Sequence, residues 1–167
     1  MWGMKRIWPA ALLPALLVAG AAEAREPLGL FGGWAAFKDA RPLRCYAISE
    51  AVDAPLSRPW RPFASISNWP GKKVRGQLHI RLGLVKQKGT PVVLFVDGRR
   101  FDLVAGGADA WAPDASADAA IVAAMRGGEA MRVEMRGEDG KRHTDQYVLR
   151  GAATAIDAAA IACSGIG

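Results

Sequence analysis

Residues 91–104 read PVVLFVDGRRFDLV, and this stretch decides the fold class. Residues 91–96 are a short, nearly continuous apolar run, which is typical of a β-strand that is covered on both faces. Asp97 and Gly98 follow, a pair that accepts the positive φ angles of a two-residue type I′ turn. Residues 99–104 then return with apolar side chains at alternate positions. The stretch therefore predicts a β-hairpin.

Further strand signals lie on both sides of this hairpin. Residues 77–84 alternate apolar and polar side chains, which predicts a strand with one face in the core. Other extended segments are predicted at residues 34–38, 45–49, 63–68, 131–136 and 143–149. Residues 25–33 contain Gly and Pro and are interpreted as a lead-in, and the Pro-rich residues 51–62 as a surface loop. About eight short strands are expected in total.

Two segments change to helical periodicity. Asp114 or Ser116 caps a predicted helix that runs to about Arg126, and an Ala-rich helix is predicted over residues 152–163. Strands and helices do not alternate regularly, so a doubly wound α/β sheet is disfavoured. We predict one all-β domain over residues 25–167, an antiparallel β-sandwich or partly open barrel with two short helices.

The N-terminal residues 1–24 have the pattern of a secretory signal peptide. Two basic residues precede an apolar run at residues 7–20, and the small residues Ala22 and Ala24 form a cleavage site. The run is shorter than the roughly 20 residues of a membrane-spanning helix. We therefore predict cleavage after Ala24, no transmembrane segment in the remaining chain, and a periplasmic or secreted protein; a retained N-terminal anchor is the alternative.

The chain has two cysteines and two histidines, too few for a zinc finger, an iron–sulfur protein or a dense disulfide scaffold. Because an exported protein meets an oxidising compartment, Cys45 and Cys163 are predicted to form a disulfide, with two free thiols as the alternative. A metal site through His79 and His143 needs at least one further convergent ligand. No metal and no cofactor are therefore predicted.

Basic residues outnumber acidic ones, 22 against 16, which gives a formal net charge of +6. Several lie in or beside turns, among them Lys72, Lys73 and Arg75, where they can attract an anionic partner. The alternative is that they are solvated edges that discourage sheet pairing. Export excludes cytoplasmic nucleic acid as the partner.

Four tryptophans follow the predicted signal peptide. Trp34 and Trp111 lie beside Ala and are predicted in the core. Trp60 and Trp69 each lie next to a proline in or beside a loop, and are candidates for an exposed recognition surface. The alternative for these two is that they pin a loop onto the core.

His143 and Asp145 are candidates for catalysis. They lie two residues apart on a predicted strand, so they share a face and can act as a base and the group that orients it. Tyr147 joins them, but no serine in a G-x-S-x-G turn accompanies them. The same residues fit equally well the solvent side of a strand whose other face holds Val148.

Four short motifs follow one another along the predicted strands and into the last helix. They are Gly33-Trp34, Cys45, Gly98-Arg99-Arg100-Phe101 and Tyr147-Val148-Leu149-Arg150-Gly151. In this order they resemble the invasion-associated locus B family of Gram-negative bacteria. The resemblance implies an exported all-β envelope protein, without an established enzymatic activity and with a link in some members to host-cell entry. It supplies no catalytic residues.

The sequence thus predicts a non-enzymatic periplasmic or cell-envelope module that binds a protein or an anionic glycolipid. The candidate contact residues are Trp60, Trp69, Lys72, Lys73 and Arg75. The alternative is a small periplasmic hydrolase that uses His143 and Asp145.

Overall fold

The computed structural model describes residues 25–165, so the predicted signal peptide at residues 1–24 lies outside them. The strands are β1 (Glu26–Phe31), β2 (Trp34–Ala40), β3 (Leu43–Glu50), β4 (Phe63–Trp69), β5 (Val74–Arg81), β6 (Val92–Val96), β7 (Arg99–Gly106), β8 (Asp109–Trp111), β9 (Ala130–Arg136) and β10 (Arg142–Val148). The helices are the 3₁₀ helix η1 (Pro70–Lys72), α1 (Ala115–Gly127) and α2 (Ala152–Ala162). Within the described residues, no helix is long and apolar enough to cross a bilayer.

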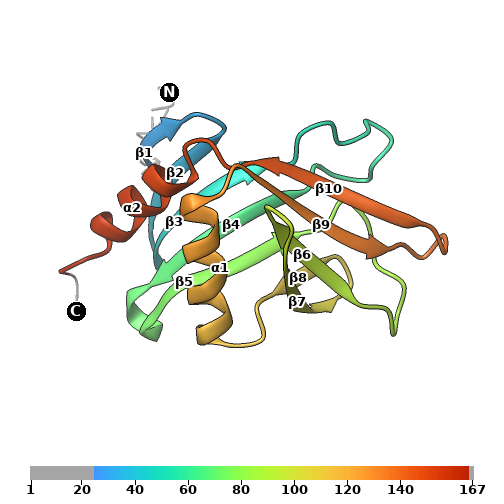
Figure 1. Ribbon diagram of the computed structural model, residues 1–167. Coiled ribbons are helices and arrows are strands. Elements are labelled where there is room, and N and C mark those ends of the chain that lie inside the picture. The colour runs from blue at the N-terminus through green and yellow to red at the C-terminus, as the bar shows by residue number, and fades with distance from the viewer. Residues whose placement is uncertain (1–24, 166–167) are drawn as a thin grey trace, which may run out of the picture.

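The strands form one antiparallel sheet in the order β1-β2-β3-β4-β5-β8-β7-β6-β9-β10 (Figure 1). The sheet bends back on itself without closing into a barrel. An isolated bridge between Val52 and Gln146 joins the segment after β3 to β10. Nearby, the Trp34 indole donates a hydrogen bond of 2.9 Å to the Val148 carbonyl. The predicted all-β class with two short helices is confirmed.

The hairpin predicted at residues 91–104 is present as β6 and β7. Asp97 and Gly98 have φ angles of 45° and 85°, as a type I′ turn requires. The Asp97 carboxylate also accepts hydrogen bonds of 3.0 Å from the amides of Glu129 and Ala130, at the start of β9. Asp97 therefore forms the turn of the hairpin and also attaches the hairpin to β9.

Two strands were not predicted from the sequence. Residues 25–33, interpreted as a lead-in, contain β1, which tolerates Pro27 and a bulge before Gly29 because it lies at the sheet edge. The three-residue β8 is too short to show a period. Its register places Ala110 in the core and Trp111 on the outside, 37% exposed. The prediction that Trp111 is a core residue is therefore wrong, whereas Trp34 is fully buried as predicted.

Helix α2 covers one face of β1, β2 and β3 (Figure 1). It begins at Gly151, whose φ is 92° and where a Cβ would lie 1.9 Å from the Phe31 carbonyl oxygen, so only glycine allows this close approach. At its other end Cys163 is bonded to Cys45 of β3, and both pack on Ala159. The predicted disulfide is confirmed.

Helix α1 attaches to β5 through a buried carboxylate. Asp114 caps the helix by accepting a hydrogen bond of 2.8 Å from the Ala117 amide. One turn later, Asp118 accepts a hydrogen bond of 2.8 Å from the Leu78 amide of β5. Burial raises the pKa of Asp118, although the Leu78 hydrogen bond opposes this. The short β8 pairs only with residues 79–81 of β5. The helix therefore supplies the hydrogen-bond acceptor for the amide of the preceding residue, Leu78.

We expect replacement of both Cys45 and Cys163 by Ala to lower the melting temperature strongly while the protein still folds at low temperature. The bond closes a separation of 118 residues, and loop entropy sets its contribution at up to about 4 to 5 kcal/mol. Helix α2 keeps its packing on β3 without the bond. Thermal unfolding followed by circular dichroism measures the effect. An unchanged melting temperature would contradict this prediction.

We expect Asp118→Asn to raise the melting temperature of the protein at pH 7. The folded pKa of Asp118 lies above its ordinary value, so the native state binds this proton more readily than the unfolded chain, and the wild type loses stability as pH rises through the folded pKa. The advantage of the variant should shrink as pH falls to about 4, near the ordinary pKa of Asp. Asp114→Asn is the matched control, because Asn caps a helix as well as Asp does. A pH-independent difference would disprove the titration argument.

Candidate functional site

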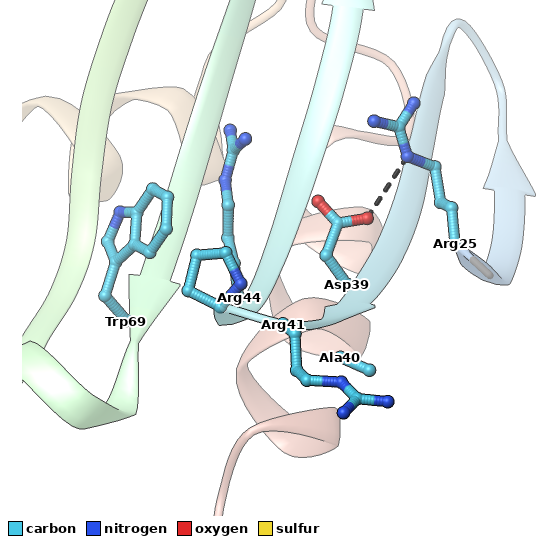
Figure 2. Close-up of a pocket in the computed structure, with 7 residues that line it drawn as sticks. Arg25, Asp39, Ala40, Arg41, Arg44 and Trp69 are labelled. Carbon is cyan, nitrogen blue, oxygen red and sulfur yellow. Dashed lines mark hydrogen bonds and ion pairs between the residues drawn. The ribbon is translucent and has the colours of Figure 1, made fainter. Parts of the chain in front are cut away.

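The hollow beside the β2–β3 turn gathers three arginines. It has a volume of about 450 Å³ and is lined by Arg25, Asp39, Ala40, Arg41, Pro42, Arg44 and Trp69 (Figure 2). Its side chains lie on the face of β2 and β3 opposite α2, because Asp39 pairs with Arg44 across the strands while the next pair, Lys38 and Cys45, points to the helix side. The lining of this arginine hollow thus holds three arginines and one aspartate, and Asp39 is paired with Arg25.

Arg44 is the central cation of the arginine hollow. Its guanidinium lies 3.9 Å from the ring centre of Tyr46 and 5.0 Å from that of Trp69. It donates hydrogen bonds of 3.0 and 3.2 Å to the Ser67 hydroxyl. Among residues 25–165 it forms no ion pair. Burial lowers the pKa of Arg44, and the nearby Asp39 charge opposes this, yet an arginine remains protonated in a protein. The direct contacts of the guanidinium are two aromatic rings and a hydroxyl.

Further cations lie against aromatic rings on both sides of Arg44. Arg25 forms an ion pair of 3.2 Å with Asp39, and its guanidinium lies 5.5 Å from the Phe37 ring. On the other side, the Lys72 ammonium lies 5.0 Å from the Trp69 ring. Burial raises the pKa of Tyr46, which keeps its phenol neutral. Such a set of planar cations and aromatic rings suits a phosphate or a carboxylate, which accepts paired hydrogen bonds from guanidinium groups.

The basic turn after β4 serves two separate hollows. Trp69 lines the arginine hollow, and the Lys72 ammonium lies over the Trp69 ring. Lys73 and Arg75 line a second cavity of about 600 Å³, whose opposite wall is the C-terminal end of α2 with Cys163. Lys73 has a φ of 54°, which ends η1 and turns the chain between the two sides. The candidate contacts predicted at this turn therefore do not form one site.

Trp60 holds the Pro-rich loop against the sheet. Its indole donates a hydrogen bond of 2.6 Å to the Leu82 carbonyl, and the Arg81 guanidinium lies 4.5 Å from its ring. The ring is half-buried. Trp60 thus attaches a loop to the sheet, whereas Trp69 lines the arginine hollow. The sequence predicts the same role for both only because each lies next to a proline.

His143 and Asp145 each have another partner. His143 Nε2 lies 2.9 Å from an Asp139 carboxylate oxygen. The buried Asp145 accepts a hydrogen bond of 3.0 Å from the Gly83 amide and forms an ion pair of 3.2 Å with Arg58 of the Pro-rich loop. Burial raises the pKa of Asp145, against the opposing effects of these two partners.

The face of β10 that carries Asp145 and Tyr147 lies in the core. Asp145 and Tyr147 are 2% and 1% exposed, whereas Val148 is 46% exposed. The interpretation that places the Asp145 side in solvent and Val148 inside is therefore wrong. The register with β9 pairs Asp145 with Val133 and Tyr147 with Met131, both core residues, which turns this face inward.

Sequence analysis did not single out Arg25, Arg41, Arg44 or Tyr46 as site residues. Arg25 lies far from the other three in the sequence, and only the pairing of β1 with β2 and of β2 with β3 brings it to them. One signal was present: Arg44 and Tyr46 are two residues apart beside a predicted strand, so they share a face.

The chain matches no family model and no curated protein sequence. It is similar in structure to invasion associated protein B from Bartonella henselae, with a TM-score of 0.58 and 16% sequence identity. The match covers 80% of this chain and 96% of that one. The resemblance predicted from the sequence is confirmed at the level of the fold: the chain has the fold of invasion associated protein B.

Proposed function

We propose that this protein is an exported cell-envelope module that works by binding, without catalysis, and that its arginine hollow takes an anionic group of an envelope protein or glycolipid. The observation that carries the proposal is Arg44. This half-buried cation forms no ion pair with any residue of the described range 25–165, and an incoming anion would supply such a partner.

The surroundings of Arg44 favour binding over chemistry. The aromatic rings and the Ser67 hydroxyl hold the guanidinium in one orientation, so little side-chain freedom is lost when a ligand arrives. The carboxylate in the hollow, Asp39, is occupied by Arg25. Such a preformed cationic site recognises an anion by charge and by geometry.

Export is supported by two independent features. The first 24 residues carry the signal-peptide pattern, with a cleavage site after Ala24. The disulfide between Cys45 and Cys163 belongs to an oxidising compartment such as the periplasm or the extracellular space. The fold shared with invasion associated protein B agrees with a place in the envelope.

We expect the mature protein to bind phosphatidylcholine vesicles that contain phosphatidylglycerol and not vesicles of phosphatidylcholine alone. Arg44→Gln should weaken this binding about tenfold, because a charge-assisted hydrogen bond contributes more than a neutral one. Binding should also weaken between low salt and about 0.15 M salt, where exposed charges are screened. Vesicle co-sedimentation measures all three effects.

The control is Arg99→Gln, which removes the same charge from the exposed start of β7, outside both hollows. A double variant of Lys73 and Arg75 to Gln tests the second cavity in the same assay. If Arg99→Gln weakens binding as much as Arg44→Gln does, net charge alone explains the attraction, and the arginine hollow is not the site. Absence of binding to the anionic vesicles also rejects the proposal.

A further inference from the structure

An apolar groove lies at the far end of the same strands. It has a volume of about 350 Å³, and its apolar lining is Leu30, Ala35, Ile48, Val52 and Val148. Gly33, Ser49 and Glu50 complete the lining. Leu30 is 76% exposed, Val148 46% and Val52 41%. A cluster of exposed apolar side chains on a soluble domain marks a binding surface more often than isolated ones do.

The groove and the arginine hollow lie on one face of the sheet. Ala35 pairs with Ile48 in the groove, Phe37 with Tyr46 in the middle, and Asp39 with Arg44 in the hollow. Successive pairs are two residues apart, so they point to the same side and are spaced by about 7 Å. The hollow and the groove are thus the two ends of a strip about 13 Å long.

The middle of the strip is aromatic. The rings of Phe37 and Tyr46 are in contact, with their centres 5.7 Å apart. Arg25 lies over both rings from the hollow side. Polarity therefore changes along the strip in one direction, from cationic through aromatic to aliphatic.

We propose that this strip binds one anionic amphiphile, with its head group in the arginine hollow and its aliphatic chain along the half-buried Phe37 and Ala35 into the apolar groove. Tyr46 is itself 2% exposed and supports the Arg44 guanidinium from below. The inference rests on the proposed function and adds the class of ligand, a lipid. Charge complementarity places the anionic head at Arg44, and the aliphatic end of the strip accepts a hydrocarbon chain.

The edge of the sheet disfavours a second copy of the chain as the occupant. The strand beside the groove is β1, which carries Pro27 and a bulge before Gly29. A proline has no amide to donate, and a bulge twists an edge away from further pairing. A protein that added a strand here would meet both obstacles, whereas a hydrocarbon chain needs no backbone hydrogen bonds.

The test measures binding of butyl, hexyl, octyl and decyl phosphate, each below its micelle concentration, by isothermal titration calorimetry. Affinity for the wild type should rise with each added methylene, by up to about fourfold where the methylene is fully buried. Inorganic phosphate should bind no better than butyl phosphate. An affinity that does not depend on chain length overturns the inference.

The groove variant is Leu30→Thr combined with Val148→Thr, since Thr has the β-branched shape that strands accept. We expect it to flatten the rise of affinity with chain length. Val104→Thr is the matched control, because Val104 is a 58% exposed strand residue outside the groove, and it should keep the wild-type slope. Circular dichroism verifies that both variants fold. A wild-type slope in the groove variant contradicts the inference.

The outcomes separate the inference from the proposed function. If butyl phosphate binds and Arg44→Gln abolishes this binding, but longer chains gain nothing, the arginine hollow binds anions and the inference about the lipid chain fails. If no alkyl phosphate binds, the proposed function fails with it. A concentration-dependent dimer in analytical ultracentrifugation that the groove variant dissociates assigns the groove to a second copy, and also overturns the inference.

Discussion

The packing of α2 on one face of β1, β2 and β3 is the constraint on which the rest of this structure depends. Strand side chains alternate between faces, so a helix that takes Cys45 into the core sends Arg44 and Tyr46 to the opposite face. The bond between Cys45 and Cys163 secures that choice of face at the end of α2. The arginine hollow and the apolar groove are both consequences of it, since each is built from the outward residues of the same strands.

Among the described residues, two arginines with limited solvent exposure differ in whether they form an ion pair. Arg58 is paired with the buried Asp145, and this ion pair attaches the Pro-rich loop to β10. Arg44 has rings and a hydroxyl around it, and the ring contacts contribute about 0.5 to 2 kcal/mol each. A paired charge serves the fold, whereas an unpaired one placed in a hollow offers binding energy to an anion. This contrast is the physical basis of the proposed site.

Much of the local structure could be predicted from the sequence. The alternation in β5, the Asp97-Gly98 turn and the capping aspartate of α1 are all properties of a few neighbouring residues. β1 could not be recognised, because its proline and glycines are acceptable only at a sheet edge, and the sequence does not say which strand is at the edge. The arginine hollow shares this limit, since Arg25 and Arg44 meet through pairing of three strands.

The sequence by itself determined where most of the strands, turns and helices lie and which two cysteines can be joined, because backbone preferences and the number of thiols are local or countable properties. Only the tertiary structure decided which face of each strand is covered. A period of two is the same for either face, and the choice is made by what packs against it. For this reason Trp111 lies outside, Asp145 lies inside, and Trp69 and Lys73 of one basic turn line different hollows.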